Sequence, residues 1–331
     1  MPTSRLSPPR ARTTSTPCRA SAELRVILTG GRGMLGSSIA ERWAIRRPYD
    51  ELVLLTRDLV DLRDKDATRE AVERIQPDSI VHAAAVVGGL AAKLANPTKY
   101  LLDNLLLDSS VISAAIDARV PELLYIGSAA VYPEHYRQPF LESDLLAAPL
   151  EPANEGYAIA KIAGIKLCEY ASSEFGLDYR VALPSNLYGP NDDYSLSHGH
   201  LIAAAIAKVH AAHIAGDASV LIWGDGTARR EFTYSLDLAD WLVSQVGALS
   251  KWPTRLNLGV GHDHTITEYY DSARRAVGYA GGFQYDTGKP AGMRQRILDS
   301  GVAHTLGWLP QTALDDGIAR VYQSYLAAQQ E

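Results

Sequence analysis

The chain has 331 residues, of which 47% are hydrophobic and 21% charged, and two are cysteines. This is enough for one large domain or two ordinary ones, and it excludes a wholly disordered chain, a collagen and a disulfide scaffold. A net charge of −6 without a long basic stretch argues against a broad nucleic-acid surface. No apolar run reaches the roughly 20 residues that cross a membrane, and Cys18 and Cys168 are far apart, so we expect a cytoplasmic protein with a small-molecule partner.

The first 185 residues predict a disordered extension followed by an α/β domain. Residues 1–22 combine arginine, serine, threonine and proline without an acidic residue or an apolar signal, which is typical of a disordered N-terminal extension. From residue 23, short apolar runs alternate with helical patterns. Strands are expected at 24–28, 51–56, 79–83, 123–127 and 179–184, with helices at 34–43, 67–75, 97–118 and 157–175. This alternation predicts a Rossmann-type, doubly wound parallel sheet over residues 23–185.

Residues 186–331 have a looser pattern with longer loops. We expect helices at 201–212, 236–249, 266–277 and 314–328 and strands at 220–223 and 256–259. Ser235 is the expected N-cap of the helix at 236. The prediction is a smaller, mainly substrate-binding region with some segments returning to the first domain.

A glycine turn connects the first predicted strand to its helix. Gly30, Gly33 and Gly36 stand where backbone N–H groups and the positive end of the helix dipole face outward, so a pyrophosphate can bind there. After the second strand, Arg57 replaces the acidic residue that would bind the ribose of NAD. Together with Arg32 in the glycine loop it favours NADP, because a guanidinium binds phosphate through paired hydrogen bonds. Asp58 is a contrary signal, and either arginine could instead be an ordinary surface charge.

A tyrosine and a lysine are spaced for proton transfer. Tyr157 and Lys161 are four residues apart on one predicted helix, so they share a face, and a nearby ammonium would lower the pKa of the phenol. Ser128 ends the fourth predicted strand, at the edge where ligands of parallel sheets bind, and could orient a substrate oxygen beside Tyr157. Taken alone, the Tyr–Lys spacing could be a helix-surface pair; with the glycine turn and Ser128 it indicates a catalytic group.

These motifs resemble the GDP-L-fucose synthase family of extended short-chain dehydrogenases/reductases over nearly everything after Leu24. The resemblance rests on the glycine turn at 30–36, the stretch 83–89, the segment 127–133 and, most specifically, residues 151–169 around Tyr157 and Lys161. Asn186 to Pro190, Trp223 to Thr227 and Arg230 to Phe232 continue it.

The resemblance implies that NADPH delivers hydride to a C4 ketone of a GDP-4-keto-6-deoxy sugar while Tyr157 protonates the oxygen, Ser128 orients it and Lys161 holds the cofactor ribose. The implied cofactor contacts are Gly30, Arg32, Gly33, Met34, Leu35, Gly36, Arg57, Ala84, Asn104 and Lys161. The implied substrate contacts are Asn186, Trp223, Arg230 and Arg296, although Trp223 could be a core residue and Arg296 a surface charge. The family also implies a homodimer formed through two helices of the cofactor domain.

One position departs from the family pattern. Inversion of a carbon beside a ketone needs proton-transfer groups on both faces, which the family supplies from a cysteine and a histidine. His200 matches the histidine, but the cysteine position is Ala130, whose methyl group carries no exchangeable proton. We therefore expect C4 reduction to be intact and epimerisation to be lost, restricted to one carbon or supported by another group.

Other readings of the sequence remain. The segment 128–132 also resembles UDP-sugar 4-epimerases, which retain NAD without net redox; Arg57 and His200 argue against this class. Dehydration is disfavoured because no Asp-Glu pair follows the hydroxyl residue. A non-catalytic cofactor-sensing protein is a third possibility, since fold does not determine function. The paired histidines at 198/200, 210/213 and 262/264 lack accompanying ligands at metal spacing, so no metal site is predicted.

Overall fold

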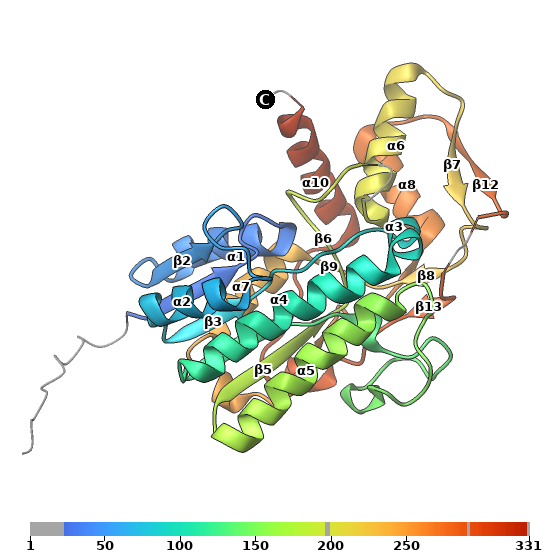
Figure 1. The fold of residues 1–331 in the computed structure, drawn as a ribbon. Coiled ribbons are helices and arrows are strands. Elements are labelled where there is room, and N and C mark those ends of the chain that lie inside the picture. Colours follow the sequence, from blue (N-terminus) through green and yellow to red (C-terminus); the bar gives the residue numbers. More distant parts are fainter. Residues whose placement is uncertain (1–22, 196–198, 290–291, 330–331) are drawn as a thin grey trace, which may run out of the picture.

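A computed structural model of the protein describes residues 23–195, 199–289 and 292–329, so the predicted extension at 1–22 lies outside the described residues. A parallel sheet of six strands forms its centre (Figure 1). The strands are β1 (Arg25–Thr29), β2 (Glu51–Leu55), β3 (Ser79–His82), β4 (Glu122–Ile126), β5 (Asp178–Pro184) and β10 (Arg255–Leu258). Their spatial order is β10-β5-β4-β3-β1-β2, which confirms the predicted doubly wound fold.

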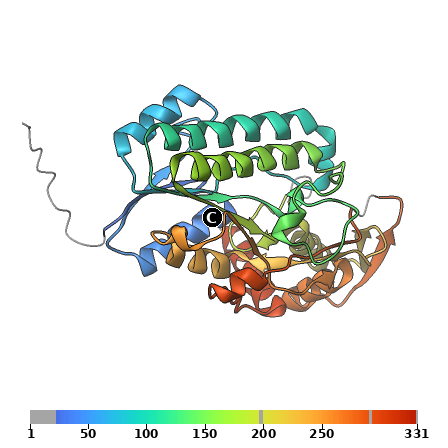
Figure 2. The ribbon, with the colours of Figure 1, turned by 90° about the horizontal axis from the view of Figure 1, so that it is seen from below.

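Helices cover both faces of this sheet (Figure 2). One face carries α2 (Lys65–Ile75), α4 (Pro97–Asp117) and α5 (Glu155–Phe175), and the other carries α1 (Met34–Arg46) and α7 (Ser235–Gln245). Ile27 of β1 belongs to the first core, whereas its neighbours Val26 and Leu28 belong to the second. Successive side chains of a strand point to opposite faces, so a sheet covered twice requires the continuous apolar runs seen in the sequence.

The start and end of α7 differ from the prediction. The N-cap is Tyr234, and Ser235 is the first helical residue. The Ser235 hydroxyl lies 2.9 Å from the Ser38 hydroxyl in α1, so it joins two helices instead of capping one. The helix also ends at Gln245, and Leu249 lies in the short 3-10 helix η3 (Leu249–Lys251).

The C-terminal region packs around its own core. It contains α6 (Leu201–Ala215), α8 (Ile266–Val277), α10 (Leu314–Ala328) and the short α9 (Gly301–Thr305). Three small sheets accompany them, formed by β7 (Ser219–Trp223) with β12 (Gly282–Asp286), β6 (Asn186–Tyr188) with β9 (Phe232–Tyr234), and β8 (Arg229–Arg230) between β11 (His264–Thr265) and β13 (Gln295–Arg296). β10 pairs with β5 in the central sheet, and α7 packs on α1.

Three further elements, absent from the sequence prediction, lie in the connections: α3 (Leu90–Ala95), η1 (Ala129–Val131) and η2 (Glu142–Asp144). α3 lies at the amino ends of α4 and α5, on the side of β8 and β13 (Figure 1). Across the described residues, no helix combines the length and apolarity needed to span a membrane.

Candidate active site

The glycine turn has the close backbone contacts that its spacing predicts. Gly30 adopts φ +71°, and a Cβ there would lie 2.6 Å from the Ala84 nitrogen. A Cβ on Gly36 would lie 2.0 Å from the Gly30 oxygen, so only glycine lets α1 approach β1 this closely. Gly33 caps α1 without a side-chain hydrogen bond, and the first turn, which begins with Met34 and Leu35, has no acidic residue. The exposed helix N-terminus therefore suits an anionic pyrophosphate.

Arg32 and Arg57 lie at the carboxyl ends of the neighbouring strands β1 and β2. Both side chains are exposed, and Arg32 forms an ion pair of 2.7 Å with Asp58. Asp58, the acidic residue that argued against NADP, is thus the partner of Arg32. Arg57 forms no ion pair with another described residue. A 2′-phosphate bound here would meet two guanidinium groups and one carboxylate.

Ser128 and Tyr157 meet beside the carboxyl end of β4. Ser128 precedes η1, and its hydroxyl accepts a hydrogen bond of 3.1 Å from the Ala130 backbone N–H. Burial and the nearby Asp108 charge raise the pKa of Tyr157, and a hydrogen bond with Ser128 partly opposes this. The expected lowering by an ammonium is not found, because burial dominates. The phenol is consequently protonated at neutral pH, which is the form that donates a proton to a new alkoxide.

Lys161 belongs to a buried network that the sequence analysis did not predict. Its Nζ lies 3.4 Å from Asp108 of α4 and donates to the Ile126 carbonyl at 3.3 Å, and both charged side chains are only 1% exposed. Asp108 also accepts hydrogen bonds from Tyr125 (2.5 Å) and His82 (3.1 Å). Although burial opposes ionisation, the Lys161 charge and the His82 hydrogen bond lower the pKa of Asp108. The Asp108 carboxylate therefore fixes the position of the Lys161 side chain behind the active-site face.

The hydrogen-bond network around Asp108 extends to the glycine turn. The His82 ring lies 2.7 Å from the Thr29 hydroxyl, which also accepts a hydrogen bond of 3.2 Å from the Ala84 backbone N–H. Ala84 is thereby held against the glycine turn. Asn104 is fully buried and binds the Val86 N–H and carbonyl at 2.8 and 2.9 Å. Its observed contacts shape the loop after β3.

Three basic side chains surround Glu151 and Asn154, and one of them contacts Tyr157. Arg230 and Arg296 are register partners on the parallel strands β8 and β13, and Arg296 donates to the Glu151 carboxylate at 2.6 Å. Burial and the charge of Arg296 lower the pKa of Arg230 to about 10. The third cation is Lys93 of α3, whose Nζ lies 4.5 Å from the centre of the Tyr157 ring. These groups provide more positive than negative charge, which suits a diphosphate.

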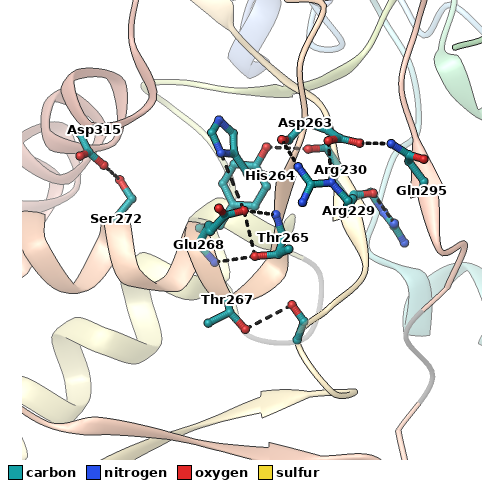
Figure 3. Close-up of polar contacts among 12 residues, drawn as sticks. Arg229, Arg230, Asp263, His264, Thr265, Thr267, Glu268, Ser272, Gln295 and Asp315 are labelled. Atoms are coloured by element: carbon teal, nitrogen blue, oxygen red, sulfur yellow. Dashed lines mark hydrogen bonds and ion pairs between the residues drawn. The ribbon is translucent and has the colours of Figure 1, made fainter. Parts of the chain in front are cut away.

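Neighbouring contacts determine which arginine of β8 points into this group. Arg229 donates to the Asp263 carboxylate at 2.7 Å and to the Asp263 carbonyl at 2.7 Å, and Gln295 binds the same carboxylate at 2.6 Å (Figure 3). Successive side chains of a strand point to opposite sides. Because its contacts with Asp263 hold Arg229 on one side of β8, the Arg230 side chain points to the opposite side, toward Arg296.

The other predicted site residues of the C-terminal region are Asn186 and Trp223, expected to contact substrate, and His200, expected to be catalytic. Asn186 begins β6 and donates to the Glu231 carbonyl at 3.0 Å. Trp223 is 45% exposed at the end of β7, so it is not a core residue. His200 caps α6, with its Nδ1 3.7 Å from Asp192. Within the described residues, His200 forms no hydrogen bond or ion pair with Ser128, Tyr157 or Lys161.

The sequence contained weak signals for the residues that were missed. Asp108 is an acidic residue in the apolar run of the fourth helix, four residues after Asn104 and on the same face. Lys93 follows the Val87-Gly88-Gly89 stretch closely. Their partners come from other elements, which spacing along the chain does not reveal. Among the described residues, no three His, Cys, Asp or Glu side chains gather as a metal site.

Comparison with known proteins agrees with this geometry. Residues 26–259 match the family model described as the NAD dependent epimerase/dehydratase family. The chain belongs to this family. The expected resemblance to GDP-L-fucose synthases is also confirmed: the GDP-L-fucose synthase of Escherichia coli (strain K12) is 40% identical over 319 residues, covering 92% of this chain and 97% of that protein.

Two other members of the epimerase/dehydratase family carry different sugar names. The GDP-L-colitose synthase of Yersinia pseudotuberculosis is 38% identical over 304 residues, covering 92% of this chain and 98% of that protein. A solved GDP-mannoheptose C4 reductase from Campylobacter jejuni, with NADP bound, has a TM-score of 0.83 at 28% identity and covers 92% of this chain and 98% of its own. Overall sequence and structural similarity therefore groups the chain with enzymes that act on nucleotide sugars, but it does not identify the sugar.

Proposed function

We propose that the protein reduces the 4-keto group of a GDP-4-keto-6-deoxy sugar with NADPH. The observation that carries the proposal is the hydrogen bond between Ser128 and Tyr157 together with the buried Lys161–Asp108 pair. Arg296, beside Arg230 on the neighbouring strand, is linked to this group through Glu151, Asn154 and Lys93. Arg32 and Arg57 favour NADP over NAD. The C4 reductase among the solved relatives supports both the cofactor and the type of reaction.

Each group has a distinct task in this reaction. The N-terminus of α1 and the glycine turn bind the cofactor pyrophosphate, and the bound NADPH supplies the hydride. Ser128 and Tyr157 hydrogen-bond the substrate ketone oxygen, and Tyr157 donates its proton to that oxygen as charge develops there. Lys161, held in place by Asp108, binds the cofactor ribose. Arg230 and Arg296 bind the diphosphate.

The direct test measures NADPH oxidation with GDP-4-keto-6-deoxymannose and related GDP-4-keto sugars, with NMR of the products. One NADPH should be consumed for each sugar reduced. The Tyr157→Phe variant should lose at least 100-fold in turnover, since positioned proton transfer contributes about 10²–10⁴. The Tyr49→Phe variant, at an exposed tyrosine away from the site, is the matched control and should retain activity.

The same experiment distinguishes the alternative functions. A nucleotide-sugar epimerase with tightly held NAD(P) would turn over without consuming NADPH. A non-catalytic cofactor sensor would show no turnover with any sugar and would keep its biological activity in the Tyr157→Phe variant. Either result would refute the proposed reduction.

We further propose that epimerisation is reduced or altered relative to GDP-L-fucose synthases. Ala130 is buried against Tyr157 and Tyr100, and its methyl group cannot exchange a proton. His200 remains as the histidine that the family pattern implies. In deuterated water, a product that is labelled and inverted at both C3 and C5 would refute this part of the proposal.

A homodimer through α4 and α5 is proposed as the assembly. These helices lie side by side (Figure 1). They carry the exposed apolar side chains Leu102, Leu105, Leu106, Ile159 and Tyr170. Apolar side chains grouped on a surface favour burial against a second copy. Sedimentation should show a dimer that Leu106→Glu dissociates, whereas Leu309→Glu, at an exposed leucine elsewhere, leaves it intact. A wild-type monomer would contradict this assembly.

A further inference from the structure

The side-chain amine of Lys93 lies among buried residues, unlike that of an ordinary surface lysine. Its Nζ lies 4.5 Å from the centre of the Tyr157 ring and donates a hydrogen bond of 3.0 Å to the Asn154 side-chain oxygen. Both Tyr157 and Asn154 are buried. The amine therefore reaches inward, to the phenol that is expected to contact the substrate oxygen.

The lysine has no direct ion-pair partner among the described residues. The nearest acidic group in its environment is Glu151, whose carboxylate already accepts hydrogen bonds from Arg296 (2.6 Å) and Asn154 (2.5 Å). Asn154 thus stands between the lysine and the carboxylate. Burial and the charge of Arg296 lower the pKa of Lys93 to about 8, and Glu151 only partly opposes them. A useful fraction of the amine is then unprotonated near neutral pH, as a general base requires.

Lys93 also lies close to the position where the family cysteine is missing. Ala130, Tyr100 and Tyr157 form one small buried cluster, and Ala92, the residue before Lys93, packs against it. The α3 helix and residue 130 consequently both contact the small cluster that contains Tyr157. An amine is present at this cluster, whereas residue 130 contributes only a methyl group.

We propose that Lys93 is the acid/base residue that exchanges a proton at one carbon beside the substrate C4 ketone. This inference rests on the proposed function, because it requires a 4-keto sugar bound at Tyr157. The unprotonated amine takes the proton from C3 or C5, and the electron pair of the broken C–H bond forms the double bond of an enolate. The negative charge moves to the C4 oxygen, where Tyr157 and Ser128 hydrogen-bond it. The new ammonium returns a proton to the same carbon, so no hydride or NADPH is consumed.

One basic group on one face gives exchange without inversion. Inversion needs a proton donor on the opposite face, for which His200 is the candidate from the sequence. The proposal therefore predicts solvent deuterium at one of the two carbons, whether or not the configuration changes.

The test separates exchange from reduction. The GDP-4-keto sugar that supports NADPH oxidation is incubated in deuterated water with the full-length enzyme and NADP⁺, which cannot deliver hydride, and loss of the C3 and C5 proton signals is followed by NMR. In Lys93→Met, the ratio of exchange rate to reduction rate should fall at least 30-fold. Lys93→Arg should show the same fall while retaining the wild-type KM, because arginine keeps the charge but does not act as a base.

Two further variants complete the test. Lys99→Met, at an exposed lysine of α4 paired with Asp103, should leave the ratio unchanged. Lys93→Met combined with Ala130→Cys should recover exchange through the restored thiol. Absence of exchange in the wild type, a wild-type ratio in Lys93→Met and Lys93→Arg, or an equal fall in exchange and reduction would each overturn the proposal. Absence of NADPH oxidation with every GDP-4-keto sugar would instead refute the proposed function, and this inference with it.

Discussion

Replacement of Asp108 by asparagine should show how far the buried carboxylate supports the active-site lysine. Asparagine has nearly the same shape and can still hydrogen-bond Tyr125 and His82, so the change mainly removes the negative charge. Because Asp108 and Lys161 are each 1% exposed, solvent does little to weaken their attraction. The variant leaves the Lys161 ammonium buried without its carboxylate.

The structure sets the size of the effect. At the observed 3.4 Å and an effective dielectric constant of about 20, the two charges attract by about 5 kcal/mol. Removing one partner of a buried pair costs about 3–5 kcal/mol. We therefore expect Asp108→Asn to lower the free energy of unfolding by about 3–5 kcal/mol, and kcat/KM for reduction to fall as Lys161 moves away from the ribose site.

Denaturant unfolding of the cofactor-free protein measures the first effect, and a double-mutant cycle with Lys161→Met isolates the pair. The double variant should be more stable than the sum of the two single losses predicts, because each single change leaves one unpaired buried charge. Tyr125→Phe, which removes one hydrogen bond and leaves both charges, is the control and should cost about 1 kcal/mol. A loss below 1 kcal/mol in Asp108→Asn, or additive single losses, would refute the reasoning.

Three other variants test separate parts of the molecule. Gly36→Ala should destabilise the protein by about 1–3 kcal/mol and abolish NADPH binding, because its methyl group would lie 2.0 Å from the Gly30 oxygen. Gly33→Ala is the control and should change thermal stability little, because its methyl group would lie 3.4 Å from the same atom. Equal melting temperatures of the two variants would contradict this prediction. Arg57→Ala should reduce the preference for NADPH over NADH about 10- to 100-fold in steady-state kinetics, and an unchanged preference would remove Arg57 from phosphate binding. Burial raises the pKa of Glu231 to about 7, above its ordinary 4.5, so the folded state binds this proton more tightly than the unfolded state. The protonated Glu231 carboxyl therefore contributes fully to stability below about pH 4.5, and this contribution declines by about 3 kcal/mol as the pH rises through 7. Glu231→Gln should reduce this pH dependence of the free energy of unfolding, measured by denaturant titration at several pH values.

Periodicity predicted the first half of the fold closely. The helices at 266–277 and 314–328 were also predicted with their observed bounds, because each begins and ends with a clear change in apolar spacing. The short strands β8, β11 and β13 were missed. Two-residue strands have no period of their own, and they form only where other segments supply the pairing partners.

Capping residues were harder to predict than helices. Ser235 is a good N-cap residue in any sequence, yet its hydroxyl pairs with Ser38, almost 200 positions away in the chain. A hydroxyl bonds whichever partner the packing brings near, and local sequence does not contain that information.

The sequence by itself predicted the parallel sheet and the glycine turn, and it indicated Ser128, Tyr157 and Lys161 as candidate catalytic residues. These predictions depend only on local spacing and on the alternation of strands and helices. Only the tertiary structure decided that Asp108 holds Lys161, that Arg230 and Arg296 stand side by side, and that Lys93 lies over the Tyr157 ring. The reason is physical: charge pairing and burial depend on distances between elements that are far apart in the chain. Folding brings these elements within a few ångströms of one another, where Coulomb and desolvation energies become large.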